Sequence, residues 1–273
     1  MKKYIACLFL FLSCTAPKKI IEDQSNHFPV TEEKVNTLPQ KDKFYIFIMA
    51  GQSNMAGRGF VQPSDTVSSP NVLVLNKNNV WVHAKEPLHY YEPGRTGLDC
   101  GLSFGKKLSS LYGKDITIGL VPCAIGGSSV EQWLGDSLYR NVKLFSNFSN
   151  KATAATAQGT IKGILWHQGE SNSSVKGYIN YQQKLESLFT NMRAVIKQND
   201  LPIYAGQLAT FLNKKENPHS PDVNNDLEKI AITDHHFYII HTGDLTPKSD
   251  TLHFDSRSQR MMGERFAREA YRH

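Results

Sequence analysis

The sequence has few cysteines, no long run of like charge and no permanent membrane span. Its 273 residues include 4 cysteines, too few for a disulfide scaffold. The net charge is +6, but the basic residues occur at most in pairs such as Lys106-Lys107. This scatter indicates a solvated basic surface and argues against a nucleic-acid partner. With 40% hydrophobic and 10% aromatic residues, the chain is rich enough to build a globular core and is not a mostly disordered protein.

The N-terminus has the pattern of an export signal. Met1-Lys2-Lys3 precedes an apolar run (4–12) that is too short to remain in a bilayer as a helix. The run ends in Phe11-Leu12-Ser13-Cys14, which resembles a bacterial lipobox, where the cysteine takes the lipid. Cleavage near Ala16 by an ordinary signal peptidase is the alternative, which Pro17 directly after that cut disfavours. We therefore expect Cys14 to be the lipidated N-terminus.

The pattern divides the chain into three parts: a lipoprotein signal peptide (1–13), a tether (14–42) and one domain (43–273). The tether is polar, lacks periodicity and carries three prolines. A lipid chain and the nearby lysines would hold the protein at a membrane surface of the bacterial cell envelope. Export would expose Cys100 and Cys123 to an oxidising compartment, and the sequence leaves open whether they pair.

Short apolar runs alternate with helical stripes over the whole domain. The runs are typical of parallel strands that are covered on both faces, and the stripes repeat every three to four residues. The expected strands are 44–50, 72–75, 116–121, 161–166, 202–208 and 237–240, and the expected helices include 104–112, 178–196 and 223–231. This alternation predicts a three-layer α/β/α sandwich with a parallel sheet.

In such sheets the ligand site lies beyond the carboxyl ends of the strands. The first strand is followed by Gly51-Gln52-Ser53-Asn54, in which a glycine permits a sharp turn that presents the Ser53 hydroxyl. A plain helix cap is the alternative role for this serine. The segment is neither a phosphate loop nor a dinucleotide-binding loop.

Three further segments follow predicted strands or precede the last helix. The first is Gly126-Gly127-Ser128, whose paired glycines can aim a backbone N–H into a cleft. The second is His167-Gln168-Gly169-Glu170, which combines an amide and a carboxylate at a strand end. In the third, Asp250 and His253 are three residues apart and can meet, so that the carboxylate orients the imidazole. Asp250 as a cap of the final helix is the alternative.

Together these segments resemble a known family. FIMAGQSNMAGRG, VPCAIGGSS, WHQGESN and DTLHF, in this order, are similar to the four blocks of the SGNH-type hydrolases. They are closest to the branch of sialic-acid-specific acetylesterases and acetylxylan esterases, carbohydrate esterase family 6. The resemblance runs from about Phe44 to the C-terminus and implies a flavodoxin-like sheet and a carbohydrate O-acetylesterase.

The resemblance also implies roles for individual residues. Ser53 would be the nucleophile, His253 the general base and Asp250 its supporting acid. The oxyanion hole would be formed by the N–H groups of Ser53 and Gly127 and the side-chain amide of Gln168. The substrate would be an acetylated carbohydrate, such as xylan or sialic acid.

Two assignments remain open at this point. Glu170 competes with Asp250 as the acid that supports His253. Trp133 and the serine-rich stretch around Asn172 are candidate sugar contacts.

No cofactor or metal is expected, because the histidines outside these segments lack ligand spacing. Among them, His235, His236 and His241 lie in and beside one apolar strand and are not expected to form a zinc site. Two other functions stay in view. One is a glycan-binding lipoprotein that has lost activity, and the other is an SGNH hydrolase for lipids or thioesters. The intact serine, aspartate and histidine set argues against the first, and the polar loops argue against the second.

Overall fold

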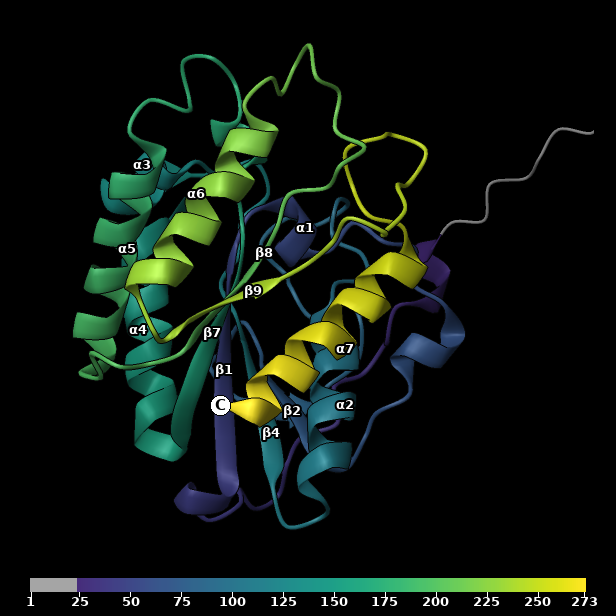
Figure 1. Ribbon diagram of the computed structural model, residues 1–273. Coiled ribbons are helices and arrows are strands. Elements are labelled where there is room, and N and C mark those ends of the chain that lie inside the picture. Colours follow the sequence, from purple (N-terminus) through teal and green to yellow (C-terminus); the bar gives the residue numbers. More distant parts are fainter. Residues whose placement is uncertain (1–23) are drawn as a thin grey trace, which may run out of the picture.

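A mostly parallel sheet forms the centre of the computed structural model, which describes residues 24–273 (Figure 1). Within that range the sheet has seven strands in the order β3-β2-β4-β1-β7-β8-β9. The strands are β1 (Phe44–Gly51), β2 (Val72–Leu75), β3 (Trp81–His83), β4 (Thr117–Pro122), β7 (Thr160–His167), β8 (Ile203–Gly206) and β9 (Phe237–Ile240). The five strands β4-β1-β7-β8-β9 have the order 2-1-3-4-5 of flavodoxin-like sheets, so this prediction is confirmed.

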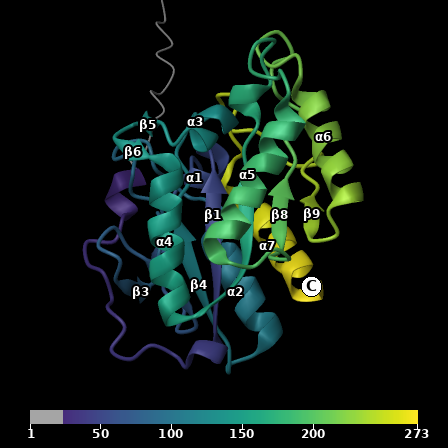
Figure 2. The same cartoon turned by 90° about the vertical axis from the view of Figure 1, so that its left-hand side faces the viewer.

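Helices cover both faces of the sheet (Figure 1). On one face α2 (Gly101–Tyr112) packs against α7 (Ser256–Arg272). On the other face lie α3 (Val130–Leu134), α4 (Leu144–Gln158), α5 (Tyr181–Ile196) and α6 (Ser220–Thr233). Figure 2 shows α4 and α5 in front of the sheet. The predicted three-layer α/β/α sandwich is therefore present.

The strands form where the apolar runs lie, because their side chains are buried on both faces. Ile46, Ile48 and Leu120 are fully buried in adjacent strands, in the register Ile46 to Gly119 and Ile48 to Val121. The expected strand boundaries are correct to within two residues, and the largest difference is at β8, which ends at Gly206, before the end of its apolar run. The sheet also has an edge strand that the sequence did not predict, β3, which runs antiparallel to β2.

Short elements surround the carboxyl ends of the strands. They are α1 (Ser53–Ala56), the hairpin of β5 (Leu138–Tyr139) and β6 (Val142–Lys143), and the 3-10 helices η1 (Gln24–His27), η2 (Lys41–Lys43), η3 (Pro63–Thr66) and η4 (Glu170–Asn172). In Figure 2 the β5–β6 hairpin and α3 lie at the end of the sheet where α1 begins. This end carries the candidate site.

The described part of the expected tether, 24–42, packs against the domain. The His83 N–H donates a hydrogen bond of 2.9 Å to the Glu33 carbonyl, and Lys34 forms an antiparallel bridge with Val82. This segment covers β3, which would otherwise be an unpaired sheet edge. The signal peptide 1–13 and Cys14 lie outside the described residues.

Two further features concern the sequence predictions. Cys100 and Cys123 are both buried and do not form a disulfide with each other. Between residues 24 and 273, no helix combines the length and the apolar character needed to cross a membrane.

Candidate active site

The turn after β1 places Ser53 at the carboxyl edge of the sheet. Gly51 has a φ of +132°, and a Cβ at this position would lie 2.1 Å from the His167 carbonyl oxygen. Glycine is therefore required for the ends of β1 and β7 to approach each other. The Gln52 N–H donates to that same carbonyl over 2.9 Å, and Ser53 begins α1 directly afterwards. The predicted strand-to-helix turn is present.

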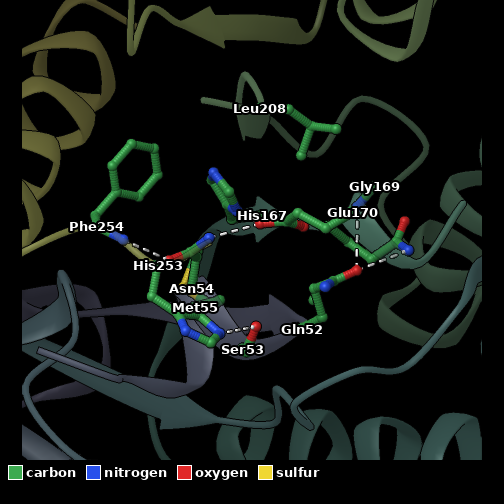
Figure 3. A network of polar contacts seen from close by, with 12 residues as sticks. Gln52, Ser53, Asn54, Met55, His167, Gly169, Glu170, Leu208, His253 and Phe254 are labelled. Carbon is green, nitrogen blue, oxygen red and sulfur yellow. Dashed lines mark hydrogen bonds and ion pairs between the residues drawn. The ribbon is translucent and has the colours of Figure 1, made fainter. Parts of the chain in front are cut away.

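Three side chains predicted from distant segments form one chain of hydrogen bonds. Ser53 Oγ lies 3.0 Å from His253 Nε2 (Figure 3), and His253 Nδ1 lies 2.8 Å from Asp250 Oδ2. The Ser53 residue is 7% exposed, so only a small part of it reaches solvent. With Nδ1–H donating to Asp250, the Nε2 lone pair faces the serine, as proton abstraction requires.

Asp250 is held in its ionised form. Partial burial acts to raise the pKa of its carboxyl, but hydrogen bonds from the His253 ring and from the N–H groups of His253 and Leu252 outweigh it. The resulting pKa is about 2. Asp250 does not cap the last helix: the N-cap of α7 is Asp255, whose side chain accepts a hydrogen bond from the Ser258 N–H.

Glu170 contacts Asn54 and does not reach His253. The Asn54 amide donates to Glu170 Oε1 over 2.6 Å, and the Asn54 carbonyl oxygen Oδ1 accepts the Phe254 N–H over 3.1 Å (Figure 3). Asn54 thereby links Glu170 to the loop that carries His253. Of the two competing carboxylates, Asp250 contacts the imidazole and Glu170 holds its loop.

His167 is buried beneath this network. Burial lowers the pKa of its imidazole below the ordinary value, against the opposing effect of Glu170. The ring is 5.7 Å from that of Phe254 in an edge-on arrangement, and His167 Nε2 is 3.1 Å from the Gln207 carbonyl oxygen. A neutral, fully buried ring in this position is part of the packing.

Two backbone N–H groups are available beside Ser53. Gly127 has a φ of +79°, a left-handed conformation that turns the loop after β4. Among residues 24–273, no hydrogen-bond acceptor is found for the Ser53 or the Gly127 N–H. Both groups were expected in the oxyanion hole.

The third expected oxyanion donor, Gln168, is placed differently. Its amide nitrogen lies 2.7 Å from Asn172 Oδ1, 3.2 Å from the Ser128 carbonyl oxygen and 3.2 Å from Gln52 Oε1. The residue is fully buried. Both N–H donors of the amide therefore have acceptors inside the protein, and the expected contact with a reacting oxygen is wrong for this arrangement.

The two candidate sugar contacts are also buried. Trp133 is 0% exposed, and its ring N–H donates to Ser128 Oγ over 2.9 Å. Asn172 is likewise 0% exposed: its oxygen accepts the Val130 N–H, and its nitrogen donates to Glu131. The expectation of direct sugar contact is wrong for both residues, because they brace the loops from behind.

A charged cluster beside Gly127 was not predicted. Glu92 Oε2 accepts hydrogen bonds from Arg58 Nη2 at 2.8 Å and from the Gly126 N–H at 2.6 Å, and Glu92 Oε1 pairs with Arg140. The Glu92 side chain is 5% exposed. Burial acts to raise the pKa of this carboxyl, but its hydrogen bond to Arg58 and the nearby charges lower it overall. An ionised Glu92 thus holds the loop that presents Gly127.

Arg140 and Tyr139, from the β5–β6 hairpin, lie over this loop. A Cβ on Gly127 would be 3.0 Å from the Tyr139 hydroxyl and 3.7 Å from Arg140 Nη2. The Arg140 side chain is 30% exposed. Arg58 stands within the AGRG part of the first motif, but no spacing in the sequence signals Glu92 or Arg140.

The groups available for chemistry at this site are a serine, a histidine, an aspartate and two backbone N–H groups. Within residues 24–273, no group of three or more His, Cys, Asp or Glu residues is arranged to hold a metal ion. The three side chains and two backbone groups suit acyl transfer, with the N–H groups facing a developing negative charge.

Carbohydrate esterases are among the known proteins that are similar to this chain in sequence and structure. A probable carbohydrate esterase of Arabidopsis thaliana, At4g34215, is 29% identical over 237 residues, which cover 80% of this chain and 86% of the plant protein. Its crystal structure superposes with a TM-score of 0.73 at 26% identity, covering 83% of this chain and 97% of that one.

Two more solved structures share the fold. NanS superposes with a TM-score of 0.69 at 17% identity, covering 86% of this chain and 98% of NanS. XAC1771, a carbohydrate acetylesterase from Xanthomonas citri, gives 0.59 at 19% identity over 82% of this chain and 54% of that one.

A match to a protein family covers almost the entire domain. Residues 43–272 match the family described as carbohydrate esterase, sialic acid-specific acetylesterase. The chain therefore belongs to this family, and it is a carbohydrate O-acetylesterase.

Proposed function

We propose that the protein removes O-acetyl groups from an acidic sugar by a serine mechanism with an acetyl-serine intermediate. The observation that carries the proposal is the continuous chain Ser53–His253–Asp250, with contacts of 3.0 and 2.8 Å. A nucleophile, a base and an orienting acid in hydrogen-bond reach are the groups that acyl transfer needs.

The reaction proceeds in two halves. His253 Nε2 takes the proton of Ser53 Oγ as that oxygen bonds to the acetyl carbon, and the carbonyl electron pair moves onto oxygen. The oxyanion accepts hydrogen bonds from the Ser53 and Gly127 N–H groups. Collapse breaks the bond to the sugar oxygen, which takes the proton from His253. Water then attacks the acetyl-serine in the same way and releases acetate.

The charges near Gly127 support an acidic sugar as the substrate. Two guanidinium groups, Arg58 and Arg140, share the single carboxylate of Glu92, so one positive charge is left over locally. Arg140 is the more exposed of the two, and planar guanidinium groups bind carboxylates well. The family description names sialic acid, which carries a carboxylate. A sialic acid or another acidic sugar is thus preferred over neutral xylan.

One set of measurements tests both parts of the proposal. Acetate release is followed with O-acetylated sialic acid, acetylated xylo-oligosaccharide and p-nitrophenyl acetate. We expect Ser53→Ala to lower kcat on each ester by at least about 10⁴-fold. Substantial turnover by this variant would contradict the serine mechanism.

The substrate class is tested with Arg140→Gln. We expect the ratio of kcat/KM for acetylated sialic acid to that for p-nitrophenyl acetate to fall by about tenfold or more, because a hydrogen bond to a charged group contributes about 1.5–3 kcal/mol. Lys143→Gln, in the same hairpin and 65% exposed at its side chain, is the matched control. An unchanged ratio in Arg140→Gln would contradict recognition of the acid.

A further inference from the structure

The side chain of Gln52 is held in one orientation beside the nucleophile. Its oxygen Oε1 lies 3.2 Å from the Ser171 N–H nitrogen, 3.3 Å from that of Gly169 and 3.2 Å from the Gln168 amide nitrogen. Backbone N–H groups only donate hydrogen bonds, so the atom that faces them must be the amide oxygen. The orientation of the Gln52 amide is therefore determined by the loop after β7.

This orientation turns the amide nitrogen of Gln52 away from the loop. In Figure 3 the oxygen points toward Gly169, and the nitrogen lies on the side of Ser53. Among residues 24–273, no acceptor is found for this nitrogen, although Gln52 is only 3% exposed. This nitrogen is not one of the fully buried side-chain atoms without a hydrogen-bond partner, so it remains accessible to solvent. Two N–H donors are thus fixed next to the nucleophile.

Gln168 differs from Gln52 in each of these respects. Its nitrogen has three internal acceptors, and its oxygen Oε1 accepts the Tyr181 hydroxyl over 3.3 Å. The two amides are in contact, because Gln168 donates a hydrogen bond to Gln52, but only Gln52 has N–H donors without an acceptor in the part of the protein that the structure describes. Gln168 is a positioning residue for Gln52.

We propose that the Gln52 side-chain amide is the third donor of the oxyanion hole, together with the N–H groups of Ser53 and Gly127. This inference rests on the proposed serine mechanism. When Ser53 Oγ bonds to the acetyl carbon, the negative charge that forms on the carbonyl oxygen accepts a hydrogen bond from Gln52 Nε2. Because the loop already holds the amide, the donor needs no reorientation during the reaction.

The test makes the same substitution, glutamine to glutamate, at two positions. Gln52→Glu keeps an oxygen for the loop N–H groups but replaces the donor with a carboxylate oxygen. We expect kcat on p-nitrophenyl acetate to fall about 10²–10³-fold with little change in KM, the usual cost of losing one oxyanion donor. The matched control is Gln132→Glu, whose oxygen accepts the Ser129 N–H in the capping box of α3. It adds the same charge near the site, and glutamate serves that cap equally well, so activity should be retained.

A second measurement separates a lost donor from a damaged fold. Methylboronic acid forms a tetrahedral, anionic adduct with a catalytic serine, whereas acetate binds as product. We expect Gln52→Glu to weaken the boronic acid by about the same factor as kcat/KM while its thermal midpoint stays near that of the wild type. The neutral variant Gln52→Met repeats the comparison if the charged one does not fold.

Several results would overturn the inference. They are wild-type kcat in Gln52→Glu or Gln52→Met, a loss confined to KM, or a loss of kcat with unchanged affinity for the boronic acid. If the wild-type protein hydrolyses no acetyl ester, the proposed function fails and the inference fails with it. If the wild type and the Gln52 variants are all fully active, the inference about Gln52 is wrong and the proposed function still holds.

Discussion

Two carboxylates support His253, one by direct contact and the other through a neighbouring residue. Asp250 binds the imidazole directly and has a pKa of about 2, so it is ionised at neutral pH. Glu170 acts on His253 only through Asn54. It accepts a hydrogen bond from the Asn54 amide, and the Asn54 side-chain oxygen accepts one from the Phe254 N–H. Losing Asp250 changes the charge and tautomer of the base, whereas losing Glu170 loosens the loop that positions it.

We therefore expect Asp250→Asn to lower kcat about 10⁴-fold, because the amide favours the wrong imidazole tautomer. Glu170→Gln should cost less, roughly 10–100-fold, since misplacement of a catalytic group by about 1 Å is enough for a loss of that size. Both are measured on one acetyl ester, with His235→Gln as a control for a histidine outside the site. If Glu170→Gln proves the more damaged enzyme, Glu170 is the working partner of His253.

At the scale of elements, the strands could be predicted and the contacts of their loops could not. Each parallel strand is a continuous apolar run, so its position follows from composition alone. The sequence did not predict β3 and the β5–β6 hairpin, because these strands are too short to show a pattern. It did not predict α4 (LFSNFSNKATAATAQ) either, because polar residues cover most of that helix and obscure its apolar stripe. The order of the strands then brings the loops after β4, β1 and β7 to one edge, which is why Ser53, Gly127 and Gln168 were found together.

The detailed roles within those loops depend on packing that no motif records. Gln52 and Gln168 carry the same amide, and the sequence resemblance selected Gln168 for the oxyanion hole. In the folded protein Gln168 is fully buried, and its N–H donors go to Asn172 in η4 and to the Ser128 carbonyl in the loop before α3. Which of two equivalent side chains reaches the site is decided by this enclosure.

The ion cluster around Glu92 makes the loop after β4 sensitive to acid. The pKa of Glu92 in the folded protein is lowered below its ordinary 4.5, so its stabilising effect is complete above that value. It is lost as the pH falls through the lowered value, where the folded protein also takes up the proton. We expect Glu92→Gln to reduce the free energy of unfolding by about 1–3 kcal/mol at pH 7 and by less at pH 3, below the ordinary value.

Urea unfolding of both proteins at the two pH values measures this difference. Glu33→Gln is the control, since Glu33 pairs with Lys85 at the exposed sheet edge, away from Gly127. A Glu92→Gln deficit that is equally large at pH 7 and pH 3 would show that the charge of Glu92 does not stabilise the loop.

At the scale of the whole molecule, the chain enters the domain at the end that carries the site. His27 in η1 donates through its ring Nδ1 to the Val61 carbonyl over 2.7 Å and packs edge-on against Phe60, in the loop that follows α1. Residue 24 is ten positions after Cys14, and an extended chain spans at most about 3.5 Å per residue. A lipid on Cys14 would therefore keep this end of the domain within roughly 35 Å of the membrane surface.

We propose on this basis that the enzyme is a lipoprotein anchored in the cell envelope, as the lipobox-like Phe11-Leu12-Ser13-Cys14 indicates. Cys14→Ala should abolish the lipid and shift the protein from the membrane fraction to the soluble fraction, while kcat on p-nitrophenyl acetate stays at the wild-type value. Cys100→Ala is the control for loss of a cysteine that is buried in the domain. Fractionation of cells and mass spectrometry of the wild-type N-terminus make the measurement. A wild-type protein that begins at a residue other than Cys14, or that carries no lipid, would contradict the anchor and the expectation that the end of the domain with the active site stays near a membrane surface.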